Sequence, residues 1–233
     1  GAQRWINLGL FKIQPSELMK IGMVLFLARY FSTTTLQNIR TIRGILIPAV
    51  MTVLPVGLIC LQPDLGTALM LLFTATIMLF VVGVQWWKFA LVGAASGALL
   101  PVAWNFLHEY QQNRVLTFLN PERDPLGAGY HIIQSKIAFG SGGIFGKGFL
   151  HGTQTHLNFL PEKHTDFIFT MFSEEFGMVG SLTLVLLNIF VIALGYLFAF
   201  RINNYFAKLV VIGLNTNYFL YVFINIAMVM GVL

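Results

Sequence analysis

Two long uncharged stretches decide the fold of this chain. Residues 44–63 read GILIPAVMTVLPVGLICLQP and residues 65–87 read LGTALMLLFTATIMLFVVGVQWW, with Asp64 alone between them. Each has the roughly 20 apolar residues that a helix needs to cross the hydrocarbon core of a bilayer. Because backbone groups in lipid must be hydrogen-bonded within the protein, such stretches are expected to be helical. They predict two neighbouring transmembrane helices joined by a short turn.

The rest of the chain repeats this pattern. Residues 89–107, 176–200 and 209–233 also lack Asp, Glu, Lys and Arg, and a sixth apolar stretch, residues 17–32, carries two ionisable side chains in its first turn. The Pro-Ser-Glu sequence at its start is typical of a helix N-terminus, with Ser16 as the candidate cap. We therefore predict an all-α polytopic membrane protein with about six transmembrane helices and a large extracytoplasmic loop.

The composition excludes an ordinary soluble globule. Hydrophobic residues make up 57% of the 233 residues and charged residues 10%, whereas soluble domains carry about 25% charged residues. The net charge of +5 is typical of basic cytoplasmic loops and does not indicate nucleic-acid binding. The single cysteine, Cys60, excludes a disulfide framework. The chain lacks an initiator Met and ends inside an apolar stretch, so we expect a piece of a longer protein.

The basic residues predict the orientation. The linkers 33–43 and 201–208 contain Arg and Lys without any acid, and Lys88 follows the third span, whereas the short turn at Asp64 is acidic. The positive-inside rule places the basic linkers in the cytoplasm. The other side then holds residues 1–16, Asp64 and the segment 108–165. The predicted organisation is one integral-membrane domain over residues 1–233, with an outer loop (1–16), four spans (17–107), an extracytoplasmic loop (108–165) and two further spans (166–233).

Several short motifs have an ordinary structural interpretation. Residues 140–148, GSGGIFGKG, depart from the phosphate-loop template, which leaves a flexible loop or a backbone nest for a lipid pyrophosphate. His151 and His156 are five residues apart and have no cysteine partner, so we interpret them as loop histidines and not as zinc ligands. Gly93 and Gly97 form a GxxxG stretch, which predicts close packing against another helix.

Two carboxylates have both a structural and a functional interpretation. Asp64 either caps the helix that begins at Leu65 or has a task at the membrane surface. Asp166 precedes an apolar run, where it is either an N-terminal helix residue or a functional group. Lys20 is its best charge counterpart on the same predicted side. Glu17, three residues before Lys20, is the alternative partner.

Six motifs stand in order along the chain: Gly1-Ala2-Gln3-Arg4-Trp5, Gln14-Pro15-Ser16-Glu17 with Lys20, Gln62-Pro63-Asp64-Leu65-Gly66-Thr67, Asn120-Pro121, Gly129-Tyr130-His131-Ile132-Ile133-Gln134-Ser135-Lys136, and Leu160-Pro161-Glu162-Lys163-His164-Thr165-Asp166-Phe167. Together they resemble the SEDS family of bacterial peptidoglycan polymerases. Gln62 and the sequence His151-Gly152-Thr153-Gln154 resemble its elongation branch, RodA, more than its division branch, FtsW. The family has ten spans, and this chain resembles spans four to nine.

The resemblance implies a peptidoglycan glycosyltransferase. Such enzymes polymerise lipid II into glycan strands at the outer face of the bacterial inner membrane, and the RodA branch serves cell elongation and cell shape. A divalent metal, Mg or Mn, is implied, with unknown ligands. The implied partners are lipid II, the nascent glycan strand, membrane lipid and a class B penicillin-binding protein in the rod-shape complex. The alternative, a lipid II flippase, would need polar groups through the membrane depth, and a purely scaffolding protein would not need Asp166.

The resemblance also assigns roles to residues. Asp166 aligns with the essential aspartate of the family, the base for the attacking sugar 4-hydroxyl. Lys20 aligns with a lysine of span four that can pair with that aspartate. Lys147 is a weaker candidate for contact with the pyrophosphate. The implied substrate-binding residues are Trp5, Arg4, Glu17, Asp64, Lys136, Gln154, Glu162 and His164.

Overall fold

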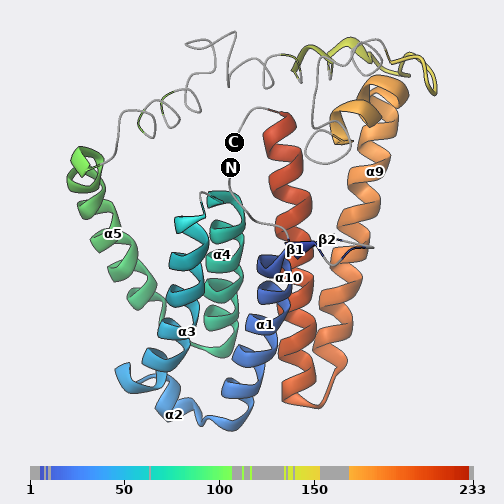
Figure 1. Ribbon diagram of the computed structural model, residues 1–233. Coiled ribbons are helices and arrows are strands. Elements are labelled where there is room, and N and C mark those ends of the chain that lie inside the picture. The colour runs from blue at the N-terminus through green and yellow to red at the C-terminus, as the bar shows by residue number, and fades with distance from the viewer. Residues whose placement is uncertain are drawn as a thin grey trace. The chain divides into compact units, whose positions relative to one another are not determined.

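Helices form nearly all of the described structure, a computed structural model that describes residues 6–7, 9, 12–62, 64–106, 112, 116, 134, 136–138, 140–152 and 168–230 (Figure 1). The elements in order are β1 (Ile6–Asn7), β2 (Lys12–Ile13), α1 (Pro15–Thr33), α2 (Leu36–Ile39), α3 (Ile42–Leu61), α4 (Leu65–Val82), α5 (Trp86–Phe106), α9 (Ile168–Arg201) and α10 (Tyr205–Val229). Each of the six apolar stretches contains a helix, which confirms the predicted all-α fold. The chain divides into two compact units: residues 1–92 with 192–221, and residues 93–191 with 222–233.

A small hairpin precedes the first helix, where the sequence predicted only a loop. Strands β1 and β2 pair antiparallel, with Ile6 opposite Ile13 and Asn7 opposite Lys12. The backbone N–H of Gly9 donates to the side-chain oxygen of Asn7 at 3.0 Å in the connecting turn. Strands of two residues are too short to show the alternation that reveals a strand in sequence.

Local chemistry sets the helix ends. Helix α4 ends at Gly83, which has a φ of +102° and caps the last turn in the left-handed conformation. The third span therefore stops before Trp86 and Trp87, which open α5. The prediction of Ser16 as a cap is wrong, because Gln14 occupies the N-cap of α1. The Ser16 hydroxyl is instead buried without a hydrogen-bond partner among the described residues.

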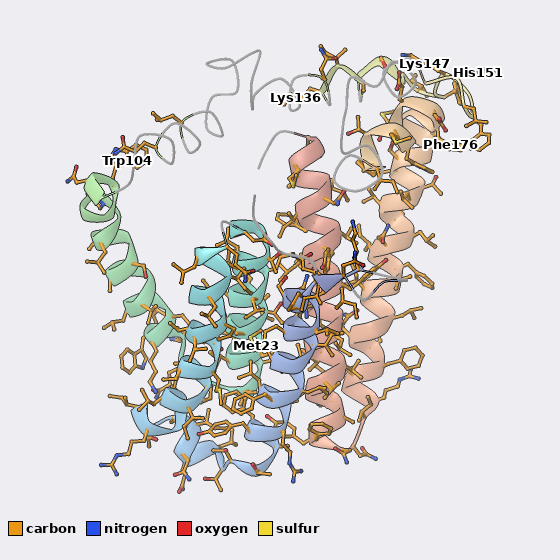
Figure 2. All side chains as sticks on the ribbon, viewed as in Figure 1. Met23, Trp104, Lys136, Lys147, His151 and Phe176 are labelled. Atoms are coloured by element: carbon orange, nitrogen blue, oxygen red, sulfur yellow. The ribbon has the colours of Figure 1, made fainter. Side chains whose placement is uncertain are left out.

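The core of the first unit lies between α1, α3, α4 and the start of α10. Met23, labelled in Figure 2, is buried there together with Leu27 and Met78. A Cβ added at Gly213 of α10 would collide with Val24 of α1, so this glycine permits a close helix contact. Small residues at such contacts are typical of helices that associate within lipid.

Three of the described helices are long and apolar enough to cross a membrane: Ile42–Leu61, Ile168–Arg201 and Tyr205–Met228. The part of α4 from Gly66 to Val82 is a shorter apolar helix. Many large apolar side chains on these helices are exposed. An exposed apolar surface of this extent is expected to face lipid or another apolar partner.

Two predictions about individual segments can be compared with the described residues. Helix α9 begins at Ile168, within the region 166–233 predicted to hold two spans, and it includes Glu174 and Glu175, which precede the uncharged stretch 176–200. The predicted packing at the GxxxG stretch is not formed within the described residues, since no described atom would lie within 4 Å of a Cβ added at Gly93 or Gly97.

Candidate functional site

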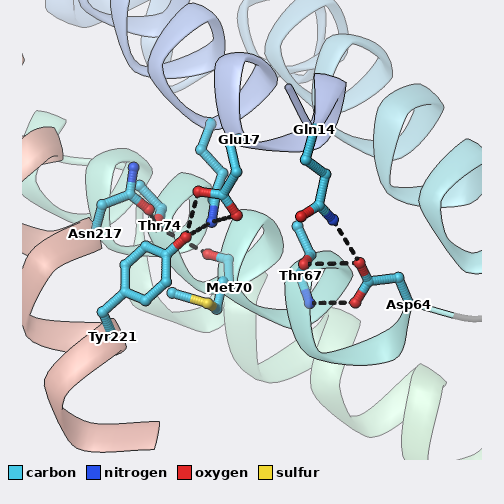
Figure 3. Close-up of polar contacts among 9 residues, drawn as sticks. Gln14, Glu17, Asp64, Thr67, Met70, Thr74, Asn217 and Tyr221 are labelled. Carbon is cyan, nitrogen blue, oxygen red and sulfur yellow. Dashed lines mark hydrogen bonds and ion pairs between the residues drawn. The ribbon is translucent and has the colours of Figure 1, made fainter. Parts of the chain in front are cut away.

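A cluster of polar side chains lies in the first unit, where the starts of α1 and α4 meet α10 (Figure 3). The ammonium of Lys20 is at its centre, with a side chain that is only 3% exposed. Its Nζ lies 2.7 Å from Oε1 of Glu17, whose side chain is 45% exposed. A buried charge is costly unless it is paired. Here the partner is Glu17, which lies about one turn away on the same helix. We call this group the Lys20 cluster; its members are Gln14, Glu17, Lys20, Asp64, Thr67 and Tyr221.

Tyr221 connects α10 to the first turn of α1. Its hydroxyl accepts a hydrogen bond from Nζ of Lys20 and donates one to Oε2 of Glu17 (Figure 3). The ammonium also lies 4.1 Å from the centre of the Tyr221 ring, where a cation is attracted to the aromatic face. The tyrosine therefore holds the lysine and the glutamate in one fixed arrangement.

Asp64 holds the start of α4 beside the same region. Its carboxylate accepts hydrogen bonds from the backbone N–H of Thr67 at 3.3 Å and from the Thr67 hydroxyl at 3.0 Å. It also accepts one from Nε2 of Gln14 at 3.1 Å. The capping interpretation of Asp64 is thus confirmed. The bond to Gln14 adds a link to the N-cap residue of α1.

The Lys20 ammonium is the donor in this cluster that a substrate oxygen could use. An ammonium has three N–H donors, and the described residues accept two of those of Lys20. Charged donors held in fixed positions stabilise developing negative charge because no reorganisation is needed during the reaction. The half-exposed Glu17 can accept a hydrogen bond from a sugar hydroxyl at the same place.

Tyr221 is a member of this cluster that was not predicted from the sequence. It lies in a span without charged residues, four positions after Asn217, whose side-chain oxygen accepts a hydrogen bond from the buried Thr74 hydroxyl at 2.8 Å. Polar residues four apart share one face of a helix, and Asn225 continues this row. The signal in the sequence was therefore a row of polar side chains in an apolar span, which a criterion based on charge overlooks.

The structure brings together Lys20, Glu17 and Asp64 of the predicted site residues. Lys136, which is exposed, belongs to the second unit. The remaining candidates, Arg4, Trp5, Gln154, Glu162, His164 and Asp166, lie outside the described residues. The pairing of Lys20 with Asp166 thus stays a prediction. Within the described part of the chain, the carboxylate partner of Lys20 is Glu17, the alternative that the sequence had left open.

A metal site is not formed by the described residues alone, since no three His, Cys, Asp or Glu side chains among them are grouped to hold an ion. Glu17 and Asp64 offer the oxygen ligands that Mg²⁺ prefers. Their oxygens are bound to Lys20, Tyr221, Thr67 and Gln14. The divalent metal therefore stays a prediction.

The chain is similar to curated proteins that are named as peptidoglycan glycosyltransferases. It is 46% identical to the peptidoglycan glycosyltransferase MrdB of Escherichia coli K12, over 100% of this chain and 63% of the relative. It is 38% identical to the probable peptidoglycan glycosyltransferase FtsW of Nitrosococcus halophilus, over 100% of this chain and 60% of the relative. The chain thus spans less than two thirds of the length of these relatives.

The solved structures that resemble this chain point to the same group of proteins as the curated relatives do. A chain of a peptidoglycan synthase complex matches with a TM-score of 0.82 at 32% identity, over 99% of this chain and 63% of that chain. RodA of Thermus thermophilus matches with a TM-score of 0.61 at 27% identity, over 97% of this chain and 57% of that chain. The apolar helices and these matches identify a multi-pass helical membrane protein. The family model of FtsW, RodA and SpoVE, described as cell cycle proteins, matches residues 1–233, so this chain belongs to that family.

Proposed function

We propose that the full-length protein is a peptidoglycan glycosyltransferase that polymerises lipid II at the outer face of the bacterial inner membrane during cell elongation. The observation that carries the proposal is the Lys20 cluster, a buried ammonium held by Glu17 and Tyr221 at the end of α1 away from the basic linker 33–43. The names of the relatives support the reaction class.

The proposed reaction joins two lipid-linked sugars. The 4-hydroxyl oxygen of the acceptor attacks the anomeric carbon of the donor, and Asp166 takes the hydroxyl proton. The bond between that carbon and the pyrophosphate breaks, and undecaprenyl pyrophosphate leaves with the electron pair. Lys20 donates a hydrogen bond to the leaving pyrophosphate. Glu17 and Tyr221 hold the Lys20 ammonium in the orientation for this bond. A divalent metal, when bound, would add positive charge for the same leaving group.

The distribution of ionisable side chains argues against a flippase. Within the first unit, α3 and α4 carry no Asp, Glu, Lys or Arg after Arg43 except Asp64 between the two helices. A transporter of a charged lipid headgroup is expected to carry ionisable groups through the membrane depth. The first unit offers its ionisable groups at the helix ends instead.

The test of this function is a reconstitution with purified lipid II. We expect the full-length protein to make glycan strands that are resolved by gel electrophoresis and degraded by a muramidase. The same preparation in vesicles should not move a fluorescent lipid II between leaflets. Translocation without polymer would favour the flippase, and neither activity, in the presence of the partner, would favour a scaffold.

The proposed partner is a class B penicillin-binding protein of the rod-shape complex. One of the matching solved chains comes from a peptidoglycan synthase complex that coordinates polymerization and crosslinking. A polymerase that works with a crosslinking enzyme must release its glycan product on the side of the membrane where the crosslinking enzyme acts. The proposal therefore includes an extracytoplasmic position for residues 108–165.

Cysteine labelling tests that topology. In a Cys60→Ser background, a cysteine at Gln154 is expected to react with a membrane-impermeant maleimide in intact cells, and a cysteine at Asn38 only after the membrane is permeabilised. The reason is the basic linker 33–43, which the positive-inside rule keeps in the cytoplasm. Labelling of Asn38→Cys and not of Gln154→Cys in intact cells would reverse the orientation and remove the proposed outer-face reaction.

A further inference from the structure

The glycine-rich segment of residues 142–148, in the second unit, is bound to a break in α9. Lys147, His151 and Phe176 lie together at this end of α9 in Figure 2. The helix is interrupted at Gly177, which has a φ of +66° and a ψ of −163°, a conformation that is essentially restricted to glycine. An interruption leaves backbone carbonyls and N–H groups without partners within the helix on either side of it, and buried groups of this kind need partners elsewhere.

The segment satisfies both ends of the interrupted helix. The backbone N–H groups of Lys147 and Gly148 donate to the carbonyls of Glu174 and Glu175, each at 3.0 Å. In return, the N–H groups of Met178 and Val179 donate to the carbonyls of Gly143 at 2.9 Å and Ile144 at 3.1 Å. Four hydrogen bonds thus cap the last turn before the break and the first turn after it.

Close backbone contact explains the glycines. A Cβ added at Gly142 would collide with the carbonyl oxygen of Ser173, and one at Gly146 with that of Glu175. Gly146 also has a positive φ of 80°. The motif therefore fits close contact with α9: the N–H groups of Lys147 and Gly148 donate to α9, and that of Gly146 donates to the Gly142 carbonyl at 2.8 Å.

A buried ion pair fastens the same contact. Nζ of Lys147 lies 2.7 Å from Oε1 of Glu174, whose side chain is fully buried, while that of Lys147 is 28% exposed. Across the break, the Ser181 hydroxyl lies 2.8 Å from both the Ser173 hydroxyl and the Gly177 carbonyl oxygen. A carboxylate buried to this degree requires a positive partner, so the ion pair with Glu174 keeps Lys147 in contact with α9.

We infer that residues 142–148 are a clasp that sets the direction of the first turns of α9, and that Lys147 is a positioning residue acting through Glu174. These turns follow Asp166 by two residues in the sequence. The effect on catalysis rests on the proposed glycosyltransferase activity, whereas the clasp itself does not. This role replaces contact of Lys147 with the substrate pyrophosphate.

Hydrogen exchange and kinetics of the full-length protein test the clasp. In Lys147→Met and Glu174→Gln, we expect exchange of the amides of residues 147, 148, 178 and 179 to accelerate at least tenfold, and kcat to fall about tenfold with KM within twofold. The exchanged pair Lys147→Glu with Glu174→Lys should recover most of the protection and of kcat. Glu175→Gln, which removes the neighbouring carboxylate, is the matched control and should leave this exchange at the wild-type rate.

The outcomes distinguish the clasp from a role of Lys147 in substrate binding. Unchanged exchange in both single variants would overturn the clasp, whether or not the protein polymerises lipid II. A raised KM in Lys147→Met that the exchanged pair does not correct would return Lys147 to a substrate-binding role. If wild type makes no polymer while the single variants accelerate exchange, the clasp stands and the proposed function fails.

Discussion

Replacing Lys20 by methionine is expected to reduce lipid II polymerisation by about 10²–10³-fold, the usual effect of removing one fixed donor from developing negative charge. Methionine has nearly the length of lysine and fits an apolar environment. The carboxylate of Glu17 that loses its partner is 45% exposed and remains hydrated. The variant should therefore fold and insert, and the loss should appear in kcat at matched membrane levels.

Companion variants separate the roles within the Lys20 cluster. Lys20→Arg should restore activity only in part, because a planar guanidinium does not replace a point charge. Tyr221→Phe keeps the ring under the ammonium and removes the hydroxyl, so we expect about a tenfold loss. Tyr196→Phe is the matched control, since it removes a tyrosine hydroxyl that bonds to Thr216 of α10 at 3.0 Å, outside the cluster.

Three possible results bear on this interpretation. If Lys20→Met keeps most of its activity, the cluster is a structural link between α1 and α10, and the proposed site reduces to Asp166. If Glu17→Ala is as inactive as Lys20→Met, then the pair acts as one unit. A mild effect of Glu17→Ala would instead indicate that Lys20 has a second carboxylate partner in the active protein, as the sequence predicts for Asp166.

Asp166→Asn is expected to lower polymerisation by about 10²–10⁴-fold, which is the usual contribution of a general base. Asparagine has the same shape and can still cap a helix, but it cannot take the proton of the attacking hydroxyl. The variant should insert normally and bind the proposed penicillin-binding protein partner. The measurement is polymer formed per protein molecule, with partner binding followed in parallel.

The capping alternative makes a different prediction for this residue. The described part of α9 begins at Ile168, two residues after Asp166, so a cap at this position would stabilise the helix by about 1 kcal/mol. Under that interpretation Asp166→Ala lowers the thermal stability, while Asp166→Asn has near-normal stability and activity. Near-normal polymerisation by Asp166→Asn would therefore remove the catalytic role.

Much of the fold could be predicted because transmembrane helices are specified locally. An uncharged stretch of about 20 residues has few alternatives to a helix in lipid, and Asp64 and Gly83 mark their helix ends by side-chain and backbone chemistry within a few residues. Helix α9 was harder to delimit because Glu174 and Glu175 lie inside it. The pairing of Glu174 depends on Lys147, 27 residues earlier in the chain, which no local pattern reveals.

The candidate site, like the fold, could be predicted from the sequence only in part. The sequence by itself determined the all-α membrane fold, the family, and the candidates Lys20, Glu17 and Asp64, since these depend on residue type and on order along the chain. Only the tertiary structure decided that Tyr221, 201 positions after Lys20, completes the pairing of the ammonium. It also decided that residues 142–148 bind on both sides of the break at Gly177. Both contacts join residues distant in the chain, and the free energy that selects them comes from burying charges and backbone groups that can be paired only after the helices have packed.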